Sequence, residues 1–418
     1  MKDRYILLFK LITFISAGAG GITASFLNLH LEQVVGLTGT EIGFVSFFSM
    51  LLVIIIKPIV GYIGDRTGQY AFVIKIALIA SIIISIFYYQ SRTFAMVITA
   101  SLLFGLVRSP IMPFKDVIIT NYCDKIKYDF GKIRVFTSLG WLLFSMLAGF
   151  LIAGIKIPWF GNQFIEFNGF LPIQVAIFGM SILASLITFI LMFFVPKPDT
   201  TESDKKQKAT KEDIKQLLTN KQFLFILTFI MTSLIVVEAA KTYMGNHLVM
   251  ELGAAENIIS WMMLVQVGPE LILLPLGAKM LQKFGFKNWY IFSVSTMILR
   301  LAVYSFTTNL TVFVILSLVH GIAVCTHIAG NIAYIRKVVA PNMLGLAFTI
   351  VASVTATTSA ILGLLFGYVY EHMNGFIVFR IATVILIGTL ILVICSKSLD
   401  EVGSSITNKL LLKENLRG

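Results

Sequence analysis

Residues 71–90 read AFVIKIALIASIIISIFYYQ, a run of twenty residues in which Lys75 is the only charged side chain. An α-helix needs about 20 mostly apolar residues to cross the hydrocarbon core of a bilayer. The run therefore predicts a membrane-spanning helix. The whole chain has the same character, because 57% of its 418 residues are hydrophobic and 13% are charged. Soluble domains contain about half apolar and about a quarter charged residues.

Similar apolar runs recur on both sides of residues 71–90, and the sequence predicts an all-α membrane protein of about twelve helices. The first six are expected near residues 6–29, 41–63, 71–90, 94–121, 131–154 and 172–195. The second six are expected near residues 222–247, 256–280, 289–307, 310–335, 343–369 and 374–396. The first run is too long for the apolar region of a signal peptide, so we interpret it as the first helix.

A polar, lysine-rich segment divides the two groups of helices. We expect an N-terminal six-helix half at 1–196, a cytoplasmic linker at 197–221, a C-terminal six-helix half at 222–397 and a cytoplasmic tail at 398–418. The linker lacks aromatic residues and is typical of a solvated tether. Its end contains Ile214, Leu217 and Leu218, a spacing compatible with a short amphipathic helix.

The basic residues lie in alternate loops. Cytoplasmic loops carry an excess of Lys and Arg, so this alternation predicts that both termini are cytoplasmic. A bacterial-type inner or plasma membrane is the expected location. The basic loop residues are Lys125, Lys127, Lys132, Lys279, Lys283, Lys287, Arg336 and Lys337, followed by Lys409, Lys413 and Arg417 in the tail.

Other classes of function find little support in the sequence. The net charge of +12 comes from these loops and not from a basic patch on a soluble domain, so we expect no nucleic-acid partner. Three widely spaced cysteines favour neither a disulfide framework nor a metal site. The chain has no HExxH, GxSxG or nucleotide-binding loop, so we expect no enzyme, no cofactor and no ATP. The expected partners are the bilayer and a small solute, and a two-half chain can work as a monomer.

A glycine-rich motif follows the second apolar run. It reads Gly61-x-x-Gly64-Asp65-Arg66-x-Gly68. A related loop reads Gln282-Lys283-Phe284-Gly285, and its last glycine, Gly285, lies 217 residues after Gly68. Glycines let helix ends approach closely and turn sharply. The motif resembles the signature loop of the major facilitator superfamily. That resemblance implies a fold of two six-helix halves, and it implies that Gly61, Gly64, Asp65, Arg66 and Gly68 form a conformational latch.

Further motifs resemble the lactose-permease branch of that superfamily, which also contains nucleoside and phenylpropionate permeases. Asp129-Phe130-Gly131-Lys132-Ile133-Arg134, followed by Gly140-Trp141, is similar to the start of helix five in the branch. Gly268-Pro269-Glu270, Arg300 and His320 fall where the branch has Glu, Arg and His in helices eight, nine and ten. The resemblance covers essentially the whole chain.

Charged residues inside a membrane are costly and usually face a cavity or a partner. Asp116 and Arg134 are 18 residues apart, the spacing of the acid–arginine pair that binds substrate in the branch. The resemblance implies that Asp116 and Arg134 bind solute and that Trp141 stacks on it. Arg108 is a further candidate for solute binding. The alternative is that Asp116 and Lys115 are simply solvated at the end of the fourth helix, which Pro110 and Pro113 are expected to kink.

Helix seven contains Glu238 and Lys241, which are three residues apart and so share one face. They form either an internal salt bridge or part of the lining of the solute cavity. Both interpretations stay open at this point, and both residues are candidates for solute binding.

Glu270, Arg300 and His320 are the candidates for coupling to protons. A buried carboxyl whose cationic partner moves away during a conformational change would gain and lose a proton. We expect Glu270 to carry the proton and Arg300 to adjust the proton affinity of Glu270. We expect His320 to be a hydrogen-bond partner. Sugar permeases of the branch carry a carboxylate one turn after the helix-ten histidine and a lysine in helix eleven. Here the first position is Ala323, and residues 343–369 contain no charge.

The sequence thus favours a secondary transporter that couples uptake of a small polar or anionic organic solute to protons by alternating access. The solute could be a sugar, a nucleoside or an aromatic acid. Sodium remains possible as the coupling ion. The alternative is an exporter of drugs or metabolites with the proton as counter-ion. Exporters of the superfamily usually have a second glycine- and proline-rich signature in helix five, but residues 131–154 contain no proline.

Overall fold

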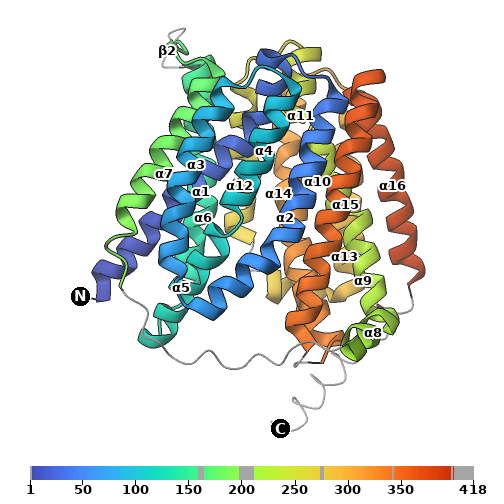
Figure 1. The fold of residues 1–418 in the computed structure, drawn as a ribbon. Helices are drawn as coiled ribbons and strands as arrows, with labels where there is room; N and C mark the ends of the chain where they lie inside the picture. The colour runs from blue at the N-terminus through green and yellow to red at the C-terminus, as the bar shows by residue number, and fades with distance from the viewer. Residues whose placement is uncertain are drawn as a thin grey trace. The chain divides into compact units, whose positions relative to one another are not determined.

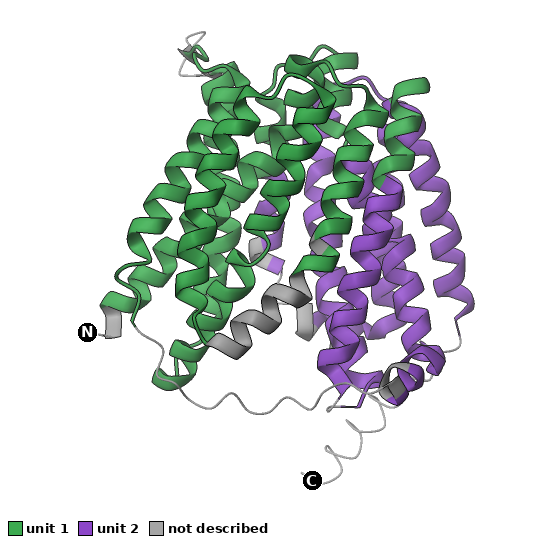
Figure 2. Cartoon of the chain, viewed as in Figure 1, with its two compact units in different colours: residues 1–205, 242–264, 363–374 green, residues 206–241, 265–362, 375–418 purple. Residues whose placement is uncertain are grey.

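The chain was studied as a computed structural model, which describes residues 2–158, 164–196, 211–273, 277–340, 343–396 and 399. It consists of two compact units (Figure 2). Unit 1 contains residues 1–205, 242–264 and 363–374, and unit 2 contains residues 206–241, 265–362 and 375–418. The expected linker at 197–221 and tail at 398–418 lie largely outside the described residues.

Unit 1 is built mainly from the first half of the sequence (Figure 1). Its helices are α1 (Lys2–His30), η1 (Leu31–Val35), α2 (Gly39–Thr67), α3 (Tyr70–Gln90), α4 (Phe94–Arg108), α5 (Ile111–Ile126), α6 (Gly131–Ala153), η2 (Val175–Gly179) and α7 (Met180–Leu191). A small antiparallel hairpin of β1 (Ile155–Pro158) and β2 (Phe164–Phe167) follows α6. Two short helices from the second half, α11 (Met244–Asn246) and η3 (His247–Glu251), also belong to this unit.

Unit 2 is built from the second half of the sequence. Its helices are α8 (Lys211–Thr219), α9 (Lys221–Thr232), α10 (Leu234–Lys241), α13 (Gly277–Tyr304), α14 (Leu310–Val338) and α16 (Gly375–Cys395). Two further helices, α12 (Ile258–Leu273) and α15 (Leu344–His372), pass from one unit into the other. The short α8 lies where the sequence was compatible with a short amphipathic helix, and it has Leu217 buried and Leu218 exposed.

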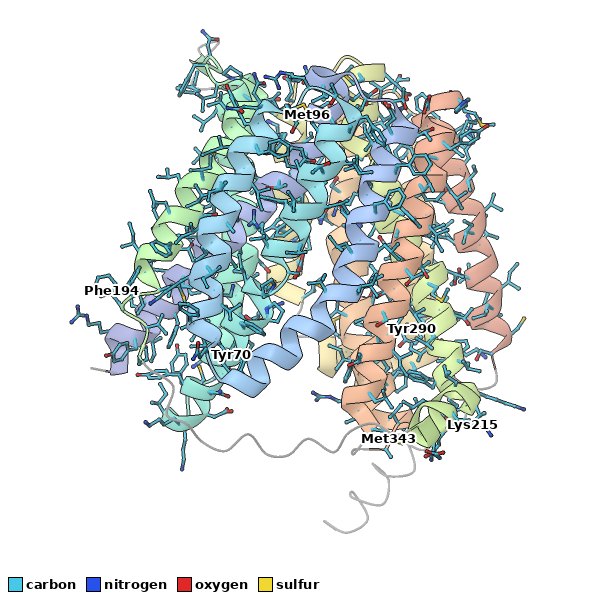
Figure 3. All side chains as sticks on the ribbon, viewed as in Figure 1. Tyr70, Met96, Phe194, Lys215, Tyr290 and Met343 are labelled. Carbon is cyan, nitrogen blue, oxygen red and sulfur yellow. The ribbon has the colours of Figure 1, made fainter. Side chains whose placement is uncertain are left out.

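The predicted helices agree well with those observed. Nine helical segments among the described residues are long and apolar enough to cross a membrane. The remaining three expected spans correspond to the short Val175–Leu191 segment, to α12 and to the second part of α13. Large apolar side chains such as Phe194 are 60% exposed, whereas Tyr290 is fully buried (Figure 3). Exposed apolar surface of this kind suits contact with lipid.

The fourth predicted helix is broken, as its prolines suggested. Helix α4 ends at Arg108 and α5 begins at Ile111, with Ser109 and Pro110 between them. Proline has no backbone N–H to donate and its ring clashes with the preceding turn, which explains the break. The break separates Arg108 from Asp116.

Helix α2 extends further than expected. The sequence suggested a loop at 61–68, but α2 continues to Thr67, so Gly61, Gly64, Asp65 and Arg66 belong to the helix. The side chains of these four residues lie outside the described part of the structure. Gly68 ends the helix with a φ of 64°, a left-handed conformation that glycine adopts without steric cost.

Helices α1 and α6 pack closely in unit 1 because both carry glycines at the contact. A Cβ atom on Gly140 would lie 2.0 Å from the backbone oxygen of Phe14, and one on Gly21 would lie 2.7 Å from that of Trp141. The backbones therefore approach to a distance that no larger residue allows. This contact fixes the position of Arg134 and Trp141 on α6 relative to α1.

Candidate functional site

A cluster of three charged residues lies in unit 1. Asp116 on α5 and Arg134 on α6 form a salt bridge, with Arg134 Nη1 2.9 Å from Asp116 Oδ2. The Arg134 side chain is 47% exposed and that of Asp116 is 29% exposed, so the pair can be reached by a solute. The structure thus brings together two residues that the sequence proposed as a pair.

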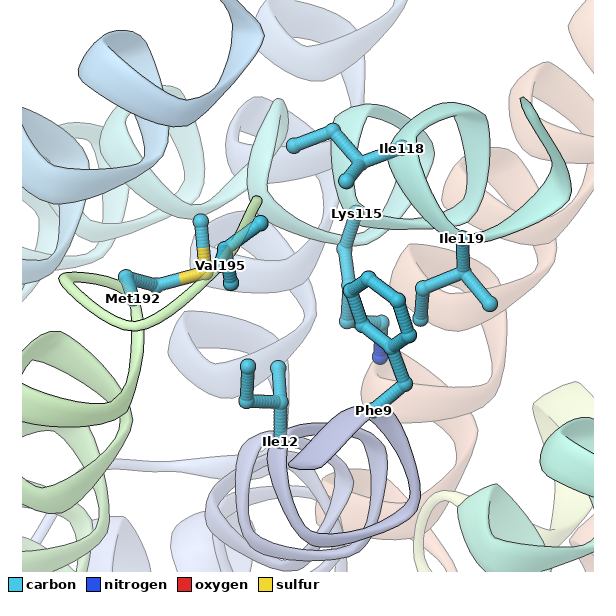
Figure 4. A pocket seen from close by; sticks show the side chains of 7 residues that line it. All are labelled: Phe9, Ile12, Lys115, Ile118, Ile119, Met192 and Val195. Carbon is cyan, nitrogen blue, oxygen red and sulfur yellow. The ribbon is translucent and has the colours of Figure 1, made fainter. Parts of the chain in front are cut away.

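Lys115 completes this cluster and is not solvated. Its side chain is buried, and its Nζ donates a hydrogen bond to Ser16 Oγ on α1 over 3.0 Å. The surrounding recess is apolar (Figure 4), and the side chains that line it with Lys115 are Phe9, Ile12, Ile118, Ile119, Met192 and Val195. Lys115 is within electrostatic reach of both Asp116 and Arg134. The cluster therefore contains two cations and one carboxylate.

Trp141 and Arg108 lie on other parts of the same unit. The Trp141 ring faces α1 at Gly20, where an added Cβ would lie 3.4 Å from the ring. The Arg108 guanidinium lies over the ring of Phe104, 4.8 Å from its centroid. In the described residues Arg108 makes no ion pair, so its contact with Phe104 is of the cation–π type.

A second charged cluster lies in unit 2, on α10, α13 and α14. Glu238 binds two neighbours at once: His320 Nε2 is 3.2 Å from Glu238 Oε1, and Lys241 Nζ is 3.4 Å from Glu238 Oε2. His320 is buried, and Arg300 is within electrostatic reach of both Glu238 and His320. Of the two interpretations of Glu238 and Lys241, the salt bridge is present, and both side chains are also partly exposed.

Arg300 is held inside unit 2. Its side chain is buried, its Nε donates to Tyr304 Oη over 3.3 Å, and its guanidinium lies 5.0 Å from the centroid of the Tyr304 ring. Tyr304 Oη donates in turn to the backbone oxygen of Phe313 over 2.6 Å. Arg300 Nη1 has no hydrogen-bond partner among the described residues. A buried guanidinium without full hydrogen bonding favours a nearby carboxylate.

Glu270 lies in α12, directly after Pro269. A Cβ atom on Gly321 of α14 would lie 2.0 Å from the backbone oxygen of Gln266, so α12 and α14 are in close contact here. Cys325 Sγ also lies 3.5 Å from the backbone oxygen of Glu270. The charges that act on Glu270 are Lys241 and Glu238. The carboxylate in contact with His320 is therefore Glu238.

Sequence reasoning missed one contact of these clusters. Ser16 binds Lys115, and a serine inside a run of small residues gives no signal of that contact. His327 is part of a buried network, in which its Nδ1 lies 2.6 Å from Ser293 Oγ and its Nε2 lies 3.0 Å from Ser233 Oγ. Both serine partners of His327 lie outside α14, the helix that carries it.

Comparison with known proteins identifies the family. The model of the MFS_1 like family matches residues 6–381. The chain belongs to the MFS_1 like family. The resemblance to the major facilitator superfamily is thereby confirmed, and the protein is an integral membrane transporter of that family.

Several transporters are similar to this chain over nearly its full length. The uncharacterized transporter YwbF of Bacillus subtilis (strain 168) is 23% identical over 91% of this chain and 90% of its own length. The maltose permease of Geobacillus stearothermophilus is 22% identical over 93% and 94% of the two chains. The crystal structure of the D323A mutant of the nucleoside transporter NupG has a TM-score of 0.79 at 16% identity, covering 93% of this chain and 99% of that one. That likeness confirms the predicted fold.

Proposed function

We propose that this transporter couples the uptake of a small polar or anionic organic solute to protons, by alternating access. The observation that carries the proposal is the charged cluster of unit 2, in which Glu238, Lys241, His320 and Arg300 lie together on membrane helices. Ionisable groups at membrane depth are expensive and mark ion or substrate pathways. Protons and solute would each bind one conformation better than the other, which couples their movements.

The solute-binding residues we propose are Asp116, Arg134 and Trp141 in unit 1, with Arg108, Glu238 and Lys241 as further candidates. Arg134 is half-exposed and carries a planar set of donors, which suits carboxylate, hydroxyl and carbonyl groups of a solute. The excess of cations around Asp116 favours polar or anionic solutes. Among the relatives, one is named for maltose and another for nucleosides, which supports a sugar or a nucleoside as the solute.

Glu270 is the residue we propose to carry the proton. Glu238 is already bound to His320 and Lys241. Within the described part of the chain, no side chain donates a hydrogen bond to the Glu270 carboxyl, whose charged neighbours are Lys241 and Glu238. Glu270 can therefore change its protonation state without breaking a contact of its own. Arg300 and His320 lie close to Glu238, and Glu238 acts in turn on Glu270. Arg300 and His320 would therefore influence the charge of Glu270 indirectly.

The test compares Glu270→Gln with Glu238→Gln in proteoliposomes. Accumulation of solute against a gradient needs the proton to be released, whereas exchange of labelled for unlabelled solute does not. Glu270→Gln should abolish proton-driven accumulation and keep exchange. Glu238→Gln should impair both, because it removes the partner of His320 and Lys241. Loss of both activities in Glu270→Gln, or normal accumulation, would contradict the role of Glu270.

The orientation and oligomeric state belong to the same proposal. The alternating basic loops support cytoplasmic termini, with the end of unit 1 at Glu32 and Glu371 on the outside. A single chain contains both proposed clusters, which supports transport by a monomer.

A further inference from the structure

One end of unit 1 joins segments from both halves of the sequence. Helices α1 and α2, with η1, come from the first half, and residues 242–264 and 363–374 come from the second half (Figure 2). The latter segments belong to helical stretches that continue into unit 2, for example α15, which enters unit 1 at Gly363. Alternating access requires such contacts to form and break.

Glu32, in η1 directly after α1, is the centre of these contacts. Its Oε2 accepts a hydrogen bond from Asn246 Nδ2 over 2.6 Å. The Tyr370 hydroxyl on α15 lies 3.1 Å from Glu32 Oε1 and 3.2 Å from Oε2. Asn246 is 1% exposed and Tyr370 is 6% exposed, so both donors are shielded from water. One carboxylate from the first half thus binds two segments of the second.

Further hydrogen bonds surround Glu32. Asn246 Nδ2 also donates to the backbone oxygen of Asn28 over 3.0 Å, and Asn28 Nδ2 donates to that of Thr242 over 3.1 Å. Gln33 Nε2 donates to Glu256 Oε1 over 3.0 Å at the exposed edge. The backbone N–H of Thr40 donates to Glu371 Oε2 over 2.9 Å. Each bond connects a first-half residue to a second-half segment.

Glycines allow the first-half and second-half segments to approach closely at this end of unit 1. A Cβ atom on Gly39 of α2 would lie 2.6 Å from the backbone oxygen of Gly367, and one on Gly367 would lie 2.3 Å from that of Gly39. The Tyr243 ring stacks on the Tyr370 ring with centroids 5.4 Å apart, and its hydroxyl donates to the backbone oxygen of Gly363 over 2.8 Å. The contact is therefore tightly packed as well as hydrogen-bonded.

The charges around Glu32 are acidic. In the part of the chain that the structure describes, Glu32 forms no ion pair with Lys or Arg. From η3, Glu251 is within electrostatic reach of Glu32 and is itself 2.7 Å from His247 Nδ1. The other titratable groups that neighbouring elements contribute are Tyr243, Tyr370, Glu371 and His372 from the second half and Glu41 from α2.

We propose that Glu32 is the hub of a proton-released latch that closes this end of the transporter. As a carboxylate, Glu32 accepts from Asn246 and Tyr370 through charge-assisted hydrogen bonds, which are about twice as strong as neutral ones. Protonation removes the charge and one acceptor position, and the segments of the second half are released. The latch rests on the transporter function, but it requires neither a particular solute nor the proposed role of Glu270.

Cross-linking across the latch tests this directly. In the full chain, Gln33→Cys and Glu256→Cys would replace two side chains that are hydrogen-bonded across the contact. Cys395, which is exposed, is changed to Ser, whereas Cys123 and Cys325 are buried. The rate of reaction with a short bifunctional methanethiosulfonate is measured in lipid vesicles between about pH 8 and about pH 5, a range that includes carboxyl titration.

The matched control is Glu41→Gln. Glu41 lies at the same end, but its Oε2 accepts from the backbone N–H of Thr38, and it binds no second-half segment among the residues that the structure describes. At each pH the cross-linking rate of every protein is divided by the rate at which its own thiols react with a monofunctional methanethiosulfonate, which cancels the effect of pH on thiol reactivity. A second variant, Tyr370→Phe, removes only a hydroxyl and guards against misfolding of Glu32→Gln.

We expect the ratio of closed to open transporter, obtained from the cross-linking rates, to be about tenfold lower in Glu32→Gln than in Glu41→Gln. The reason is that about one charge-assisted hydrogen bond is lost. Tyr370→Phe should shift the ratio in the same direction. The parent should cross-link more slowly as the pH falls, and Glu32→Gln should lose that dependence. Equal rates in Glu32→Gln and the control would overturn the latch. A parent rate that does not change with pH would overturn its release by protons.

Discussion

Arg134 donates a hydrogen bond from Nη1 to Asp116 Oδ2 over 2.9 Å, and the two residues come from consecutive helices, α5 and α6. The pair is partly exposed, so a solute can compete for either side chain. Asp116→Asn keeps the shape and removes the charge. A hydrogen bond to a charged group contributes about 1.5–3 kcal/mol, so we expect a roughly tenfold weaker apparent affinity for solute.

The control for Asp116 is Asp129→Asn. Asp129 Oδ1 accepts a hydrogen bond from the backbone N–H of Gly131 at the start of α6 over 2.8 Å, whereas the salt bridge of Arg134 is made to Asp116. Uptake measured over a range of solute concentrations gives the apparent affinity of each variant. Arg134→Lys should be almost as damaging as Asp116→Asn, because lysine cannot present two parallel donors. Unchanged affinity in both variants would remove this pair from the solute site.

The contacts of Glu238 predict a measurable coupling energy. Glu238→Gln leaves Lys241 and the buried His320 without their carboxylate partner, and Lys241→Gln leaves Glu238 with His320 alone. Residues in direct contact show coupling energies of about 0.5–3 kcal/mol in a double-mutant cycle. We expect the double variant to be less destabilised than the sum of the single ones in thermal unfolding. Strict additivity would mean that the Glu238–Lys241 contact contributes nothing to stability.

The contact between α1 and α6 predicts a strong size limit at Gly140. Gly140→Ala would place a Cβ 2.0 Å from the backbone oxygen of Phe14, so the helices must separate. Overpacking of this kind costs about 1–3 kcal/mol. We expect Gly140→Ala to lower the unfolding temperature and the uptake rate together. Gly388→Ala on α16 is the matched control, because its Cβ would meet no atom within 4 Å, and it should be neutral or slightly stabilising.

The left-handed conformation of Gly68 predicts a graded effect of substitution. With a φ of 64° and, in the described part of the chain, no atom within 4 Å of an added Cβ, backbone strain is what opposes a larger residue. Gly68→Ala should cost about 1–2 kcal/mol in unfolding free energy, and Gly68→Asn should cost less, because asparagine tolerates this conformation better. Equal stability of the three proteins would show that α2 ends in another way.

The membrane helices could be predicted from the sequence because the length of an apolar run is a local property. Residues 71–90 became α3, which spans Tyr70–Gln90, and the prolines after Arg108 marked the break between α4 and α5. The end of α2 was placed too early, because Gly61 and Gly64 are tolerated inside the helix and only Gly68 needs a positive φ.

The partners of the charged residues could be predicted only in part. The spacing of Asp116 and Arg134, read through a family resemblance, led to a real contact. His320 was expected to be a hydrogen-bond partner, but its contact with Glu238 joins α14 to α10, and no local pattern encodes which helix supplies the carboxylate. The Glu32 contacts depend on residues more than 200 positions away, which no local pattern encodes.

Proton movement caused by solute is the most direct test of coupled uptake. External pH is followed in de-energised cells that express the transporter, while maltose, nucleosides and aromatic acids are added one at a time. Proton-coupled uptake predicts a rise in external pH with one solute, and no rise in cells that express Glu270→Gln. Solute entry without any change in pH would contradict proton coupling. A fall in external pH as the added solute enters would instead indicate an exporter that runs in reverse and exchanges solute for protons.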